Sequence, residues 1–167
     1  MLNQRALKIL IAYFSWRGAT AKVAARLLND AAGHKVTILR ASPKKDREYW
    51  QWLILSFFPG SYVDIDLGLL DVSKYDLILM GSPKWTVSCP PFNRLLKSLR
   101  GTAGKRVGYF MTYGGFDAER YVRASLRALE SLKMEPIGSL AVKRVLTEGP
   151  GYLPMVDGFW KHLQDEI

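Results

Sequence analysis

The sequence predicts an α/β protein in which a doubly wound, five-stranded parallel sheet carries helices on both faces. Three observations favour this fold. Strand and helix signals alternate along the 167 residues, which is the rhythm of a parallel sheet with crossover helices. The expected strands are nearly continuous apolar runs, as is typical of strands covered on both faces. The sequence holds no repeat, low-complexity tract or linker, so we expect one domain over residues 1–167.

The first expected strand is LKILIAYF, which is apolar almost throughout. Four later segments carry the same signal, and each is followed or preceded by a helical pattern. The five expected strands are residues 7–14, 34–39, 76–81, 105–114 and 137–142.

Four helices are expected between and after these strands. Apolar residues recur at helical spacing after Gly18, and Gly33 is a fitting stop. Two prolines suit the first turn of the second helix, and Asp117 is the expected N-cap of the third. The helical ranges are 19–32, 90–99, 117–132 and 155–167.

The segment from Tyr49 to Phe58 has almost no polar face, although a covering helix should be amphipathic. Three interpretations stay open. The segment is a well-buried second helix, or it is a homodimer interface or a lid over a ligand site. In the third it lies on a membrane surface, where its Trp residues and the flanking Lys44, Lys45 and Arg47 would fit.

The chain is basic, since 24 Lys and Arg residues outnumber 15 acidic ones and give a net charge of +9. This surplus favours an anionic partner such as an acidic protein or a membrane surface, unless it is general surface charge. The basic residues form no dense run, and no zinc spacing or RNA-binding aromatic motif is visible, which argues against nucleic acid. The longest apolar stretch is about half of the roughly 20 residues that a spanning helix needs. We therefore expect a cytoplasmic protein that is either free or peripheral to a membrane.

Ligands of doubly wound sheets sit beyond the carboxyl ends of the strands, which directs attention to three loops. The first is YFSWRGATAKVA, where Gly18 lets the backbone approach a ligand and the following helix offers free N–H groups. Ser15 and Thr20 offer hydroxyls, and Arg17 offers a guanidinium suited to phosphate. The loop is either a phosphate site or an ordinary capped turn.

The second loop is GSPKWTVSCPP, in which Trp85 is well placed to stack on a planar ring. Ser82 and the loop amides would satisfy the polar edges of that ring. The alternative is that Trp85 folds back over the core.

The third loop is MTYGGFD, where paired glycines permit close backbone approach beside Thr112 and Tyr113. Alone it is equally well read as a tight strand-to-helix turn. Together the three loops provide a phosphate cradle, a stacking aromatic and a glycine-rich edge. That combination suits a mononucleotide with a large flat base.

Other chemistries find little support in the sequence. The first loop lacks the Walker pattern and does not begin with Cys. No Ser-His-Asp or paired-carboxylate arrangement stands out, and neither His34 nor His162 is assigned a catalytic role. Lone Cys89 cannot form an internal disulfide, and it is either a small packing residue or a group facing the ligand.

At these loops the sequence resembles the flavodoxins, whose phosphate loop reads Ser/Thr-x-Thr-Gly-x-Thr. Ser15, Gly18 and Thr20 match that pattern, and Arg17 stands where the middle Thr is usual. DLILMGSPKWTVSCPPFNRLL is similar to the third-strand segment of the broader flavodoxin-like group, and GYFMTYGGFD falls where the second flavin loop belongs. The resemblance implies FMN as cofactor and no metal.

The resemblance also implies which residues hold the FMN. The phosphate would be held by Ser15, Trp16, Arg17, Gly18, Ala19 and Thr20. The flavin ring would be framed by Ser82, Pro83, Lys84, Trp85, Thr112, Tyr113, Gly114 and Gly115. No protein residue is expected to be catalytic, because the flavin carries the chemistry.

These features lead us to expect an FMN-dependent oxidoreductase that reduces a quinone or similar acceptor with electrons from NAD(P)H or a redox partner protein. The basic character and the apolar segment are the reasons. One alternative is a flavodoxin-type electron carrier without a small-molecule substrate. Another is a flavin-free interaction domain on the same scaffold, since a fold alone does not guarantee a function.

Overall fold

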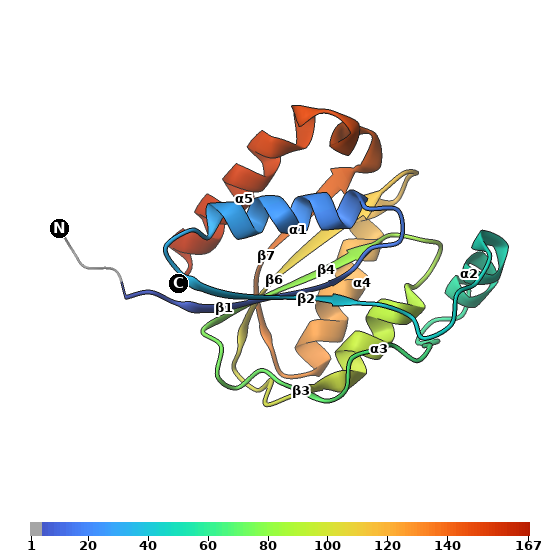
Figure 1. The fold of residues 1–167 in the computed structure, drawn as a ribbon, viewed down its shortest axis with the longest axis horizontal. Coiled ribbons are helices and arrows are strands. Elements are labelled where there is room, and N and C mark those ends of the chain that lie inside the picture. The colour runs from blue at the N-terminus through green and yellow to red at the C-terminus, as the bar shows by residue number, and fades with distance from the viewer. Residues whose placement is uncertain (1–4) are drawn as a thin grey trace.

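The computed structural model describes residues 5–167 and confirms the predicted parallel sheet (Figure 1). The strand order is β2-β1-β4-β6-β7, and all four neighbouring pairs are parallel. The five strands are β1 (Lys8–Phe14), β2 (Lys35–Ala41), β4 (Leu77–Pro83), β6 (Arg106–Tyr113) and β7 (Glu135–Lys143). A separate two-residue ladder joins β3 (Leu70–Asp71) to β5 (Leu99–Arg100), which the sequence pattern does not predict.

Helices cover both faces of the sheet, as Figure 1 shows. One pair is α1 (Ala19–Asp30) and α5 (Leu153–Asp165), and the other is α3 (Pro90–Ser98) and α4 (Ala118–Ser131). Alternate residues of β1 divide between the two layers, since Ile9 and Ile11 pack toward α1 and α5 whereas Leu10 packs toward α3 and α4. Two short 3₁₀ turns, η1 (Arg144–Glu148) and η2 (Pro150–Tyr152), link β7 to α5.

Two boundary residues differ from the sequence prediction. β4 continues through Ser82 and Pro83, so Ser82 belongs to the strand and not to the loop after it. Asp117 is the N-cap residue of α4 but has φ of 61°, and its side chain makes no capping hydrogen bond. Its carboxylate lies 3.8 Å from the guanidinium of Arg120 instead.

Gly81 marks a close contact between two central strands. It pairs in register with Phe110 of β6, and the Phe110 ring occupies the space that a β-carbon on residue 81 would need. The glycine therefore lets the ring pack directly against the backbone of β4.

The apolar segment forms helix α2 (Tyr49–Ser56), and its interpretation as a well-buried helix is wrong. Only Trp52 and Ser56 of this helix are buried, whereas Trp50 is 59% exposed. Figure 1 shows why: α2 lies at the right, past the ends of the strands, and covers neither face of the sheet. No helix within residues 5–167 is long and apolar enough to cross a membrane.

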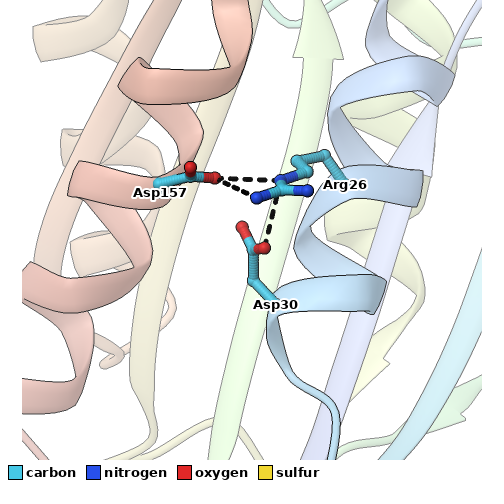
Figure 2. A network of polar contacts seen from close by, with 3 residues as sticks. All are labelled: Arg26, Asp30 and Asp157. Atoms are coloured by element: carbon cyan, nitrogen blue, oxygen red, sulfur yellow. Dashed lines mark hydrogen bonds and ion pairs between the residues drawn. The ribbon is translucent and has the colours of Figure 1, made fainter.

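Charged side chains tie α1 to α5, as Figure 2 shows. The Nη2 atom of Arg26 lies 2.7 Å from Oδ1 of Asp157, and its Nε atom lies 3.0 Å from Oδ1 of Asp30. The other oxygen of Asp30 is buried and has no hydrogen-bond partner among the described residues. Burial raises the pKa of Asp30 above its ordinary value, although Arg26 opposes the shift.

Asp30→Asn is therefore expected to stabilise the protein at pH 7. The gain should be at most about 1 kcal/mol, because Asp30 and Arg26 both remain partly solvated. A raised folded-state pKa makes the ionised Asp30 a cost at neutral pH, and protonation removes that cost. The gain should shrink as the pH falls toward the ordinary aspartate pKa of 3.8. Urea unfolding of both proteins across this range measures it. A variant that is less stable at every pH would show that the ion pair with Arg26 outweighs the burial.

Candidate functional site

The carboxyl ends of β1, β4 and β6 border a cleft at one edge of the sheet. All three loops selected from the sequence contribute to it, because parallel strands end at one edge of the sheet. The residues that line it are Ser15, Trp16, Arg17, Ala19, Thr20, Pro83, Lys84, Trp85, Thr112, Tyr113, Gly114 and Arg144. Eleven of these twelve are among the fourteen residues selected from the sequence.

The first loop presents the start of α1 to the cleft. Gly18 is the N-cap residue and adopts φ of 90°, a conformation that favours glycine. The Ser15 hydroxyl accepts a hydrogen bond from the amide of Ala21 at 3.2 Å. Within residues 5–167, the amides of Ala19 and Thr20 have no hydrogen-bond acceptor. With the positive end of the helix dipole, these two N–H groups suit an anion.

Two hydrogen bonds join the third loop to the others. The hydroxyls of Thr20 and Thr112 lie 2.8 Å apart, and both side chains are buried. The amide of Lys84 donates to the carbonyl of Thr112 at 2.7 Å. The three loops therefore form one connected rim instead of three independent turns.

Aromatic side chains form the wall of the second loop. The Trp85 ring packs edge-on against Phe14 with centroids 5.6 Å apart, and it lies 5.4 Å from the buried ring of Trp52. Trp85 rests on the core, as the second interpretation expects, and it also lines the cleft, where its stacking on a planar ring stays a prediction. Trp16 stacks on Tyr49 of α2 with centroids 5.1 Å apart.

Three selected residues lie outside the lining. Ser82 is fully buried, and its hydroxyl is hydrogen-bonded to Tyr109 at 2.7 Å, so it is directed into the core. Burial raises the pKa of Tyr109, whose hydroxyl also accepts a hydrogen bond from Ser125 at 3.1 Å. Gly18 acts through its backbone conformation, and Gly115 follows the last lining residue of its loop.

Arg144 is the lining residue that the sequence reasoning missed. It opens η1 directly after β7, and a β-carbon on Gly114 would lie 3.4 Å from its guanidinium. Its signal was available, because a basic residue after the last strand reaches the same sheet edge as the three selected loops. Arg40, whose guanidinium donates to the carbonyl of Ser15 at 2.8 Å, supports the first loop from β2 and had no comparable signal.

The charged side chains that line the cleft are all positive. Arg17, Lys84 and Arg144 line it, and no carboxylate of the described residues does. A neighbouring hollow shares Arg17 and Arg144 and adds Lys22 and Glu148. Such a cleft favours an anionic ligand.

The cysteine and the two histidines have packing or hydrogen-bonding roles in the structure. Cys89 is buried in the core, and this burial raises the pKa of its thiol, so it fits the packing interpretation. The Nδ1 atom of His34 accepts a hydrogen bond from the amide of Leu7, and Nε2 of His162 is hydrogen-bonded to the carbonyl of Ile137. In the described part of the chain, no three His, Cys, Asp or Glu residues are grouped to hold a metal ion.

Comparisons with known proteins identify the fold. No family profile matches the sequence. An uncharacterized protein of Archaeoglobus fulgidus is 32% identical over 109 residues, which are 65% of this chain and 68% of that protein, and the two belong to one family. A flavoprotein of Lactobacillus acidophilus, crystallised in complex with FMN, has a TM-score of 0.68 at 24% identity and covers 81% of this chain and 93% of its own. The two-electron reduced flavodoxin of Megasphaera elsdenii has a TM-score of 0.62 at 22% identity and covers 92% and 98%.

The protein has the flavodoxin-like fold. Its strand order places β1 between β2 and β4, so the topological switch point of this flavodoxin-like protein lies between β1 and β4. The cleft opens at that point, where the loops after these two strands diverge. The position of the cleft therefore follows from the topology of the fold.

Proposed function

We propose that this flavodoxin-like protein binds FMN in the cleft and functions as a redox protein. The observation that carries the proposal is the connected rim, which places two free helix amides and a stacking Trp around one basic cleft. The amides of Ala19 and Thr20, with the guanidinium of Arg17, would hold the phosphate. Trp85 and Tyr113 would border the flavin ring.

When bound, FMN supplies the electron chemistry, and the protein positions it and controls access. Arg17, Lys84 and Arg144 place positive charge around the cleft and so favour any negative charge that develops there. The buried hydroxyl pair of Thr20 and Thr112 fixes the spacing between the two loops that would hold opposite ends of the cofactor.

Within this class we propose an oxidoreductase that takes electrons from NAD(P)H or a protein donor and passes them to a quinone or similar acceptor. The aromatic wall that connects the cleft to α2 supports an apolar planar acceptor. An electron carrier remains the second candidate, because the same cleft would serve a flavin that exchanges electrons only with partner proteins.

An absorbance spectrum of the purified protein, followed by an FMN titration of any apo form, tests the cofactor. We expect flavin bands or stoichiometric uptake of added FMN. A colourless protein that ignores FMN would overturn the proposal and favour an interaction domain. With FMN bound, steady NAD(P)H oxidation in the presence of a soluble quinone supports the oxidoreductase, and turnover only with a partner reductase supports the carrier.

A further inference from the structure

The outward face of α2 takes no part in the proposed flavin site. Tyr49, Trp52 and Ser56 follow each other at i, i+3 and i+7 and turn toward the protein. The opposite side of the helix and the residues just after it carry four large apolar side chains that are between 51% and 61% exposed. We call these four residues the outer α2 stripe: Trp50, Ile54, Phe57 and Phe58.

Hydrogen bonds hold the outer α2 stripe in this orientation. The carbonyl of Ser56 accepts from the amides of Val87 and Ser88 at 3.1 Å and 2.9 Å. The hydroxyls of Ser56 and Thr86 lie 2.7 Å apart, and the Ser88 hydroxyl donates to the carbonyl of Phe58 at 3.1 Å. The helix is thus fixed to the second loop of the cleft with its apolar stripe facing outward.

Cations lie beside this apolar surface. Lys44 and Lys45 are exposed just before α2. The Lys97 ammonium lies 5.0 Å from the centre of the exposed Tyr62 ring, and the Arg94 guanidinium lies 5.9 Å from the same ring. Aromatic rings interleaved with basic groups are typical of surfaces that enter the headgroup region of a bilayer.

Carboxylates near α2 offset only part of this charge. The side chain of Glu48 accepts a backbone hydrogen bond at the helix start, as part of a capping box with Gln51. Asp64 lies 3.9 Å from Arg94, and Asp46 stands between the exposed lysines and α2. A second copy of the chain docked on this face would bring two sets of cations together, whereas an anionic surface would be attracted to them.

We propose that the outer α2 stripe docks this protein on an anionic lipid bilayer. The stripe enters the boundary between headgroups and acyl chains, and the neighbouring lysines contact the anionic headgroups. The inner face of α2 touches Trp16 and Trp85, which line the cleft, so docking brings the rim of the cleft close to the membrane. If the proposed function holds, an apolar acceptor then reaches the cleft directly from the lipid.

Co-sedimentation with lipid vesicles tests this docking without reference to flavin. We expect binding to vesicles in which about a third of the phosphatidylcholine is replaced by phosphatidylglycerol, and at least about tenfold weaker binding to phosphatidylcholine alone. Raising the salt from about 0.05 M to about 0.5 M should weaken the binding, since it screens the lysines.

Matched variants assign the contact to residues. Trp50→Ser with Phe57→Ser should reduce partition on the order of 10- to 100-fold, because two exposed aromatic side chains are lost from the contact. Leu69→Ser with Met155→Ser removes apolar side chains that are 73% and 38% exposed elsewhere and should leave partition unchanged.

The charge variants form a second matched pair. Lys44→Glu with Lys45→Glu should abolish the preference for phosphatidylglycerol. Lys35→Glu with Lys74→Glu changes the net charge equally at a basic hollow near the other end of the strands and should retain it. Far-UV circular dichroism and a cooperative urea unfolding transition show that each variant is folded.

Three results would overturn the docking proposal. One is equal binding to both kinds of vesicle. Another is vesicle binding that is retained by the Trp50→Ser, Phe57→Ser variant but lost by the Lys35→Glu, Lys74→Glu variant. The third is no vesicle binding together with a homodimer that dissociates when the stripe is removed. A protein that binds vesicles but no FMN would support the docking and refute the proposed function.

Discussion

Arg17→Glu is expected to weaken FMN binding on the order of 10- to 100-fold while leaving riboflavin binding within about threefold of the unchanged protein. Riboflavin has the same ring system as FMN and lacks the phosphate. Arg17 borders the cleft next to the free amides of Ala19 and Thr20, so under the proposed function reversing its charge should act on the phosphate and not on the ring. Quenching of flavin fluorescence during titration measures both affinities.

Arg123→Glu is the matched control for that experiment. Arg123 is exposed on α4 and away from the cleft, and its reversal changes the net charge by the same amount. We expect an FMN affinity within about threefold of the unchanged protein, because distant exposed charges are screened. If Arg17→Glu weakened FMN and riboflavin equally, the phosphate would lie elsewhere.

Gly81→Ala is expected to destabilise the protein by about 2–4 kcal/mol, because the added methyl overlaps the ring of Phe110 between two central strands. Neither strand can move away easily, since each is hydrogen-bonded on both of its edges. The midpoint of urea unfolding measures the loss.

Gly158→Ala is expected to have the opposite effect on the stability of the protein. Gly158 lies inside α5, and no heavy atom is within 4 Å of an added β-carbon. Alanine should therefore stabilise the helix by about 0.5–1 kcal/mol. Equal effects at the two glycines would contradict the packing of Phe110 on β4.

The main strands and helices could be predicted because their signals are local. The run at β1 and the spacing in α1 each reflect burial against the sheet, and the structure confirms both. The ladder of β3 and β5 could not be predicted, since two residues per strand carry no period. The sequence left the exposure of α2 open for a different reason: an all-apolar helix is normally buried, and only the tertiary structure shows that this one lies beyond the sheet.

Part of the candidate site could likewise be predicted from the sequence, and part could not. The loops that meet at the sheet edge could be predicted from strand order, and most of their residues do line the cleft. The direction of a single side chain could not be predicted. Ser82 points to Tyr109 because β4 continues to Pro83, two residues beyond the expected end of the strand. Arg144 was not predicted because the three selected loops follow β1, β4 and β6, although β7 ends at the same edge.

The position of β1 has a consequence during synthesis on the ribosome. This strand emerges first, yet its second neighbour, β4, ends roughly 70 residues later. At about 5–20 residues per second, one edge of an apolar strand stays unpaired for about 3 to 14 s in the nascent chain. Exposed strand edges template intermolecular pairing, so this interval is when that edge is open to such pairing.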